Sequence, residues 1–363
     1  MDYRIEPPYD HGTPARTGVL VVNLGSPQAP TAAATRRYLA QFLSDPRVVE
    51  IPRWAWWPIL HGIILRIRPS KSAAKYATIW TEAGSPLVSL TQRLVQRVQD
   101  SLLQAQSSVV VEFGMRYGTP SIGGALDRLR QAGAQRILVL PLYPQYAAAT
   151  TASAWDAVAQ WVSQARFVPE MRFVNHYHDH PTYIAKLAES VRQHWRSHGR
   201  GELLVMTFHG LPQRSLLLGD PYHCECYKTA RLLGQALELP PTAYRVTFQS
   251  RFGRAQWLRP YTEPTLRELA AQGLRRVDVV CPGFSVDCLE TLEEIAQEAR
   301  DAFLESGGQE FHYIPCLNDS QAAGDLVLQL IQDHTTGWPP GTPMTTHELA
   351  QQKLQAQSMG AQR

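Results

Sequence analysis

His209 and Glu290 each follow a short apolar segment, and both side chains can handle protons or metal ions. His209 follows the apolar run in LLVMTFHGLP (203–212), and Glu290 lies a few residues beyond VDVVC (277–281). Such runs predict buried parallel strands, and ligands of open α/β sheets gather beyond the carboxyl ends of these strands. We therefore expect the imidazole and the carboxylate to face each other across one crevice and to transfer protons or bind a metal. Taken alone, His209 could instead be a structural histidine at a strand end.

The acids around Glu290 form a second pattern. If residues 288–299 form a helix, Asp287, Glu290 and Glu294 lie at positions i, i+3 and i+7, along one face. The alternative is that acids such as Glu293 and Glu294 stabilise the helix N-terminus from a solvated face. The coincidence of a histidine and an acid after two separate strands favours a functional site.

Two further groups contain residue types that bind metals. His176, His178 and His180 alternate in HYHDHP, so an extended segment would place them on one face, either as a metal site or as a hydrogen-bonded loop cluster. Cys224 and Cys226 form a CxC pair among only five cysteines. An odd number of cysteines, some of them in apolar segments, favours free thiols in a reducing cytoplasm.

The chain contains a long internal repeat. GVLVVNLGSP (18–27) resembles LLVMTFHGLP (203–212), and ALDRLRQAGAQRILVLPLYP (125–144) resembles TLRELAAQGLRRVDVVCPGF (265–284). In both copies of the longer segment a helical pattern ends at a glycine, which suits a helix C-cap, and an apolar strand follows. A repeat of this length predicts two similar βα domains with a ligand site between them.

Expected strands alternate with helical stretches, which predicts an α/β fold with parallel sheets and helices on both faces. The expected strands are residues 18–24, 109–113, 136–142, 171–175, 203–208, 244–248, 277–281 and 310–314. We place an N-terminal domain at residues 1–165 and a C-terminal domain, carrying His209 and Glu290, at residues 166–333. Residues 334–363 are polar and proline-rich, and we expect a loose tail there.

Composition excludes several classes of function. The 35 basic and 32 acidic residues give a formal charge of +3 without a long basic block, so nucleic acid is not an expected partner. The glycine turns match neither GxGxxG nor a phosphate loop, so nucleotide binding has no support. The polar N-terminus predicts no signal peptide, and the lack of a run of about 18 apolar residues predicts no spanning helix. We expect a cytoplasmic protein.

One segment, residues 51–71, combines tryptophans with aliphatic and basic residues. It holds Trp54, Trp56, Trp57, Ile59, Leu60, Ile63, Ile64 and Leu65, flanked by Arg53, Arg66, Arg68 and Lys71. This composition is typical of an interfacial membrane anchor or of a wall for an apolar ligand, although a buried helix is the alternative. We expect residues 54–65 to meet a membrane surface.

Several short motifs, in order along residues 18–330, resemble those of the ferrochelatase family. They are NLGSP (23–27), YPQY (143–146), HGLP (209–212), GDPY (219–222), QSRFG (249–253) with Trp257 nearby, and DCLETLEEI (287–295). The resemblance implies two Rossmann-like domains around a porphyrin cleft, the chelatase fold. It also implies a lyase-type enzyme that inserts Fe²⁺ into protoporphyrin IX and releases two protons, the last step of haem synthesis. Iron is then a substrate, and no cofactor is required.

The resemblance also implies roles for matched residues. His209 and Glu290 would jointly handle iron and protons at the porphyrin, and Asp287 and Glu294 would extend an acidic path. The other matched positions are Arg116, Tyr117 and Tyr143 on the metal side of the cleft, Arg68 and Tyr76 at the propionates or cleft lip, Leu24 against the macrocycle, and Trp257 in the wall. Residues 54–65 match a hydrophobic lip that admits porphyrin from the bilayer, which implies peripheral attachment to the inner face of the cytoplasmic membrane.

The resemblance leaves alternatives that differ in substrate or in class. They are a coproporphyrin ferrochelatase, a chelatase that inserts cobalt or nickel into a more carboxylated tetrapyrrole, and a non-catalytic porphyrin carrier. The tryptophan-rich lip and the few candidate arginines favour protoporphyrin. A 2Fe–2S cluster, which some family members carry, is not expected: it needs four ligands, the tail has no cysteine, and residues 147–149 near YPQY are alanines.

Overall fold

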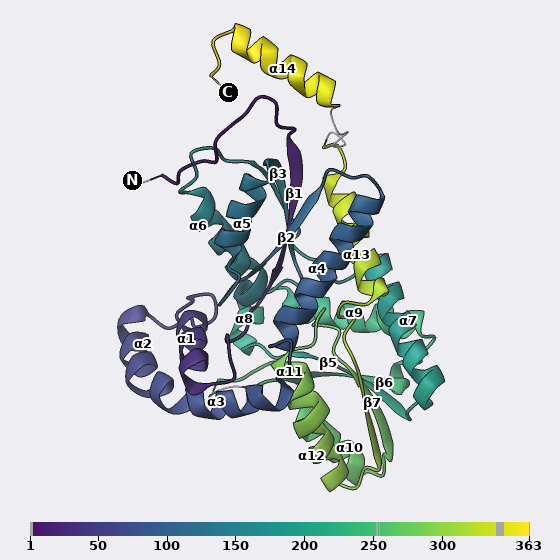
Figure 1. Cartoon of the computed structure of the whole chain (residues 1–363). Coiled ribbons are helices and arrows are strands. Elements are labelled where there is room, and N and C mark those ends of the chain that lie inside the picture. The colour runs from purple at the N-terminus through teal and green to yellow at the C-terminus, as the bar shows by residue number, and fades with distance from the viewer. Residues whose placement is uncertain (1–2, 252, 254, 339–344, 363) are drawn as a thin grey trace.

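Two four-stranded parallel sheets form the centre of the molecule (Figure 1). The computed structural model describes residues 3–251, 253, 255–338 and 345–362. The first sheet has the order β2–β1–β3–β4 and the second the order β6–β5–β7–β8, so equivalent strands occupy equivalent places. The strands are β1 (Arg16–Asn23), β2 (Val110–Met115), β3 (Ala134–Pro141), β4 (Glu170–Phe173), β5 (Leu203–His209), β6 (Tyr244–Gln249), β7 (Arg276–Val280) and β8 (Glu310–Ile314). All the predicted strands are present, and the α/β class and the duplication are confirmed.

Helices cover both faces of each sheet, as expected for parallel strands joined by crossovers (Figure 1). The first half contains α1 (Ala32–Leu43), α2 (Arg53–Ile59), α3 (Leu65–Ile79), α4 (Pro86–Gln104), α5 (Ile122–Gln131) and α6 (Ser153–Val162), with π-helical turns η1 (Leu60–Ile64) and η2 (Ala148–Ala152). Then follow α7 (Pro181–His198), α8 (Gln213–Leu217), α9 (Tyr222–Ala236), the 3₁₀ turn η3 (Pro241–Ala243), α10 (Thr262–Ala271), α11 (Leu289–Leu292), the π-helical η4 (Glu294–Ala299), α12 (Arg300–Glu305), α13 (Gln321–Thr335) and α14 (Thr346–Ser358).

Strand β1 shows why its segment is wholly apolar. Successive side chains of a strand point to opposite faces, and here both faces are buried. Leu20 and Val22 pack in a cluster that belongs to the first half alone, whereas Val19 and Val21 pack in a larger cluster that also contains β5 and α9 side chains. The two halves therefore share one hydrophobic core, which fixes how they pack together.

The carboxyl ends of the two sheets meet. Gln145, in the loop after β3, donates from Nε2 to the Pro282 carbonyl, in the loop after β7, at 3.3 Å. Tyr177, in the loop after β4, is hydrogen-bonded through its hydroxyl to Ser285 Oγ at 2.9 Å. Residues that follow strands in either half are thus brought to one junction, where ligands of this class of fold bind.

Two predicted boundaries need correction. Strand β4 pairs with β3, so the first sheet continues past the boundary predicted after residue 165. The predicted loose tail is wrong for α14, because Thr345 and Glu348 form a capping box that starts a helix beyond the prolines. Residues 339–344 of that tail, and Phe252 of the QSRFG motif, lie outside the described residues.

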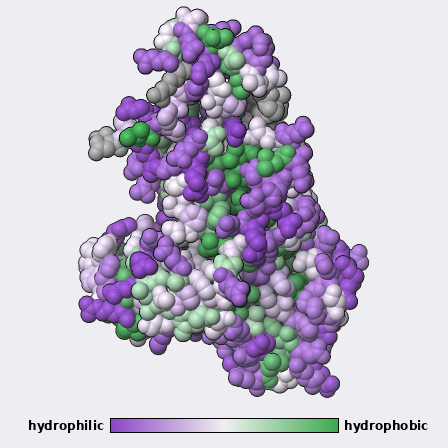
Figure 2. All heavy atoms as spheres, viewed as in Figure 1, coloured by the Kyte–Doolittle hydropathy of each residue, from purple (hydrophilic) through white to green (hydrophobic). Residues whose placement is uncertain are grey.

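Helices α1, α2 and α3 form an arm beside the junction (Figure 1). Trp56 joins α2 to the end of α1 within the arm, because its Nε1 donates to the Leu43 carbonyl at 2.7 Å. Trp54, Trp57 and Ile63 point outward instead, and Trp54 keeps 82% of its surface exposed. Figure 2 shows pale and green, less hydrophilic residues on this arm, at lower left. No helix of the described residues is long and apolar enough to cross a membrane.

Candidate functional site

His209 is the last residue of β5, at the carboxyl edge of the second sheet. Its Nδ1 lies 2.6 Å from the Gly210 carbonyl oxygen. Because a carbonyl can only accept, the proton of the neutral ring resides on Nδ1, and Nε2 keeps its lone pair. The ring therefore presents a nitrogen that can accept a proton or bind a metal ion.

Glu290 and Glu294 lie on the same side of the second sheet as His209. Gln249 pairs with His209 in the β5–β6 register, and its Nε2 donates to the Glu290 carbonyl at 2.6 Å. The Glu294 carboxylate accepts hydrogen bonds from the Ser250 backbone, at 2.6 Å, and from its hydroxyl. Burial raises the pKa of Glu294, the Ser250 bonds and the nearby His209 lower it, and Glu290 raises it further. The histidine and the two acids thus form one electrostatic group.

Ser250 holds this group with a strained backbone. Its φ is 63°, in the left-handed region that non-glycine residues rarely adopt. This conformation aims both the amide and the hydroxyl of Ser250 at Glu294. Local strain of this kind is typical of positions that orient functional side chains.

Asp287 does not continue the predicted acidic path. Helix α11 begins at Leu289 with Cys288 as its N-cap, so Asp287 precedes the helix and the helical spacing does not apply to it. Its buried carboxylate accepts from Thr291 Oγ1 at 2.9 Å, from Asn318 Nδ2 at 2.6 Å and from the Tyr313 hydroxyl. With its lone pairs occupied by protein donors, Asp287 holds the loop before α11 in place.

Glu293 has a structural partner. It forms an ion pair with Lys75 of α3 at 2.9 Å, and Lys75 also pairs with Glu298 at 2.7 Å. These contacts bind the arm to the second half close to Glu290. Glu293 is therefore a structural acid, but it is buried and ion-paired rather than on the solvated face that the alternative interpretation expected.

Two predicted residues of the first half, Arg116 and Tyr117, belong to a buried network. Arg116 donates to Asp45 at 2.5 Å and to Ser153 Oγ at 2.6 Å, and the Tyr117 hydroxyl donates to Asp45 at 2.8 Å. The pKa of Tyr117 is raised mainly by burial. Both side chains are therefore committed to protein partners, and they can position neighbouring groups.

Tyr38 and Tyr76 lie near Glu290, while Tyr143 lies near the Arg116 and Tyr117 network and Arg68 lies near Tyr76. Burial raises the pKa of Tyr76 and of Tyr38, and the Glu290 charge raises the pKa of each further, so both rings lie close to that carboxylate. Tyr143 lies near Tyr117 and Tyr38, and its buried hydroxyl has no hydrogen-bond partner within the described residues. Burial lowers the pKa of Arg68, and neighbouring Tyr76 opposes this effect. Tyr38 had no sequence motif that could have revealed it.

Leu24 and Trp257 flank the junction from opposite halves. Leu24 directly follows β1, and its carbonyl accepts from the Tyr117 amide at 2.9 Å. The Trp257 ring lies so close to Gly210 that a Cβ there would approach it to 3.2 Å. Trp257 therefore lies beside the residue that follows His209.

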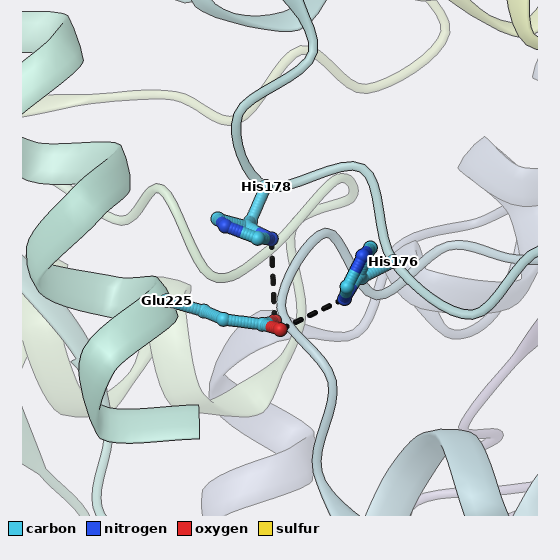
Figure 3. A group of neighbouring side chains, drawn as sticks. All are labelled: His176, His178 and Glu225. Atoms are coloured by element: carbon cyan, nitrogen blue, oxygen red, sulfur yellow. Dashed lines mark hydrogen bonds and ion pairs between the residues drawn. The ribbon is translucent and has the colours of Figure 1, made fainter. Parts of the chain in front are cut away.

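The predicted histidine trio is wrong in one member (Figure 3). His176 and His178 converge on Glu225, with Nδ1 of His176 at 2.8 Å and Nδ1 of His178 at 3.3 Å from its oxygens. His180 instead caps α7 and faces Asp333 at 3.0 Å. The backbone turns at residues 178–179, so the alternation of an extended segment does not extend to His180.

The cysteine pair is also divided by its helix. Cys224 and Cys226 lie two residues apart on α9, and residues at this spacing point to nearly opposite faces of a helix. Cys224 is exposed, and Cys226 is buried in the core. Glu225, between them, is the residue that joins the histidines.

Known proteins resemble the chain over its whole length. The ferrochelatase family matches residues 16–335. A ferrochelatase of Methylibium petroleiphilum is 58% identical over 100% of both chains, and one of Polaromonas sp. is 57% identical over 100% of both. Among solved structures, SirB from Bacillus subtilis with Fe³⁺ matches with a TM-score of 0.50 at 13% identity, covering 88% of this chain and 96% of that one. The chelatase-like DR2241 from Deinococcus radiodurans matches with a TM-score of 0.53 at 11% identity, covering 87% of this chain and 55% of that one. The two solved structures show the fold. The family match and the two ferrochelatases show that the chain belongs to the ferrochelatase family.

Proposed function

We propose that this protein inserts Fe²⁺ into protoporphyrin IX, forms haem b and releases two protons, as a lyase-type metal chelatase in the last step of haem synthesis. The observation that carries the proposal is the 58% identity to a ferrochelatase over the full length of both chains. The free Nε2 of His209 and its acidic neighbours supply groups that this reaction needs. Iron acts as substrate, and the reaction requires no resident cofactor.

The two pyrrole protons need acceptors, and the arriving iron must lose water. We assign both tasks jointly to His209 and Glu290, since imidazole nitrogen and carboxylate oxygen both accept protons and both bind Fe²⁺. Glu294 has a raised pKa, so it exchanges protons closer to neutrality than an ordinary carboxyl and can pass them to or from Glu290. Oxygen and nitrogen ligands suit iron in transit, because thiolates would retain it.

The remaining residues hold the macrocycle. Leu24 and Trp257 offer apolar surface to its ring, and the Arg68 guanidinium suits a propionate carboxylate. Tyr76 lies close to Glu290 and Tyr143 close to Tyr117, and in this proposal both contact the macrocycle. Arg116 and Tyr117 position their neighbours from the buried Asp45 network. Asp287 takes no part in metal transfer in this proposal, because protein donors occupy its carboxylate.

The direct test is anaerobic incubation with Fe²⁺ and either protoporphyrin IX or coproporphyrin III, followed by haem absorbance and porphyrin fluorescence. We expect multiple turnovers with protoporphyrin IX and a lower kcat/KM with coproporphyrin III, because the latter carries two more carboxylates. The reverse preference would make the protein a coproporphyrin ferrochelatase. Binding without turnover would make it a porphyrin carrier.

Glu290→Gln should lower kcat by roughly 100-fold, because the amide neither accepts a proton nor carries charge to bind iron. The variant preserves side-chain size, so porphyrin binding, followed by fluorescence quenching, should change little. Glu305→Gln, at an exposed acid in α12, is the matched control. Unchanged kinetics in Glu290→Gln would remove this carboxylate from the reaction.

We also propose that the arm docks on the inner face of the cytoplasmic membrane, where an apolar porphyrin would be collected. The exposed Trp54, Trp57 and Ile63 support this, since such side chains partition into the bilayer interface. Changing all three to serine should weaken liposome binding at least about 10-fold in a flotation assay. The matched control changes the exposed Leu354 and Met359 of the C-terminal region to serine. Equal flotation of both variants would contradict docking through the arm.

A further inference from the structure

His176, His178 and Glu225 form a compact group that the proposed reaction does not use (Figure 3). The two histidines lie in the loop that follows β4 of the first sheet, and the glutamate lies in the first turn of α9, which follows β5 of the second. We propose that this group is a second metal site, which binds a divalent first-row transition ion such as Zn²⁺, Co²⁺ or Fe²⁺ and links the two halves. It shares no residue with the His209 and Glu290 group.

The spacing of the ligand atoms suits such an ion. One nitrogen from each histidine and one Glu225 oxygen lie within 4.8 Å of one another. Ligands about 2.0–2.2 Å from a tetrahedral ion lie about 3.3–3.6 Å apart, so small side-chain movements would complete the geometry. Two imidazoles and one carboxylate leave a coordination position for water, and this ligand set prefers transition ions to Mg²⁺ or Ca²⁺.

A buried nitrogen points independently to a missing ligand. His178 is only 5% exposed, and its Nδ1 has no hydrogen-bond partner in the described part of the chain. It lies 3.3 Å from Glu225 Oε2, but that contact is not a well-aligned hydrogen bond. An unsatisfied buried nitrogen costs stability, and a metal ion on Nδ1 would remove that cost.

Surrounding groups hold the three ligands in place. The Tyr146 amide donates to Glu225 Oε2 at 2.7 Å, and Thr229 Oγ1 donates to the His178 carbonyl at 2.8 Å. Asp179 lies 3.9 Å from Nε2 of His178, the position where metal-binding histidines commonly meet a carboxylate. His176 keeps 44% of its side chain exposed, so an ion can reach the group from solvent.

The test is a Co²⁺ titration of chelator-treated full-length protein under argon, followed by visible absorption. Tetrahedral or five-coordinate Co²⁺ with nitrogen and oxygen ligands gives stronger bands than hydrated Co²⁺. We expect these bands in the unaltered protein and also in His209→Ala, which lacks the proposed insertion ligand. His176→Ala should lower the affinity by roughly 100-fold or more. His347→Ala, at an exposed histidine of α14, is the matched control.

Thermal unfolding gives a second measurement, because an ion that joins the halves stabilises the folded protein. Zn²⁺ should raise the unfolding midpoint of the unaltered protein and of His347→Ala, but not of His176→Ala. Since His176 is half-exposed, its removal should leave the fold intact, and circular dichroism checks this.

The proposal is overturned if His176→Ala keeps these bands when it is combined with His209→Ala, or if His209→Ala alone removes them all. Absence of strong bands in the unaltered protein would mean that the group is an ion pair only. Because Co²⁺ binding is measured without porphyrin, these outcomes do not depend on whether the protein forms haem.

Discussion

Replacing His209 with alanine should abolish haem formation, with kcat lowered by at least about 100-fold. The variant loses the free Nε2 that β5 and the Gly210 carbonyl orient. It also removes the nearby imidazole that lowers the pKa of Glu294, so that acid should hold its proton to higher pH. The measurement is anaerobic, single-turnover and steady-state haem formation from protoporphyrin IX and Fe²⁺.

Porphyrin binding separates chemistry from folding in this experiment. The apolar contacts proposed for Leu24 and Trp257 persist in His209→Ala, so fluorescence quenching by protein should give a similar Kd. His347→Ala should behave like the unaltered protein in both assays. Near-normal turnover by His209→Ala would contradict the assigned role, and lost turnover together with lost circular dichroism would call for His209→Gln as the informative variant.

Gly25→Ala should strongly destabilise the fold at the junction. Gly25 has a φ of 107°, and an added Cβ would lie 1.8 Å from the Tyr117 carbonyl oxygen, far inside van der Waals contact. We expect a loss of at least about 3 kcal/mol in the free energy of unfolding, from backbone strain and overpacking together. Urea unfolding followed by circular dichroism measures it.

Gly84→Ala is the matched control for this substitution. Gly84 has a similar φ of 94°, but an added Cβ would meet nothing within 4 Å. Its loss should be only the backbone term, about 1–2 kcal/mol. Equal losses in the two variants would mean that the segment containing Tyr117 moves aside without cost.

The strands and the duplication could be predicted because each depends on local pattern. A strand buried on both faces is mostly apolar, as are the central residues of β1 and the first four residues of β5. The sequence could point to His209 because it ends such a strand, and to Glu290 because it lies in the short helix α11 that follows β7. The pairing of β4 with β3 could not be predicted from the sequence. A short edge strand with exposed positions has no clear pattern of hydrophobic residues.

Side-chain partners far apart in the sequence were beyond prediction. Glu225 lies 49 residues from His176 in the sequence. It stands between Cys224 and Cys226, and the sequence pattern draws attention to these two cysteines as metal ligands rather than to Glu225. Asp287 has the helical spacing in the sequence, but the helix begins after it. Its carboxylate accepts hydrogen bonds from Thr291 and Asn318, so its role is structural. Such outcomes depend on where helices begin and on which donors the tertiary fold brings near.

Leu24 and His209 occupy matching positions in the duplicated halves. Leu24 precedes Gly25 at the end of β1, and His209 precedes Gly210 at the end of β5. An ancestor with identical halves would have offered the same side chain twice, and a planar ligand between them would have had two equivalent faces. Divergence at this pair leaves the aliphatic side chain of Leu24 in one half and the basic imidazole of His209 in the other. The two halves therefore differ at a position where a planar, nearly symmetric ligand would otherwise meet the same side chain on both faces.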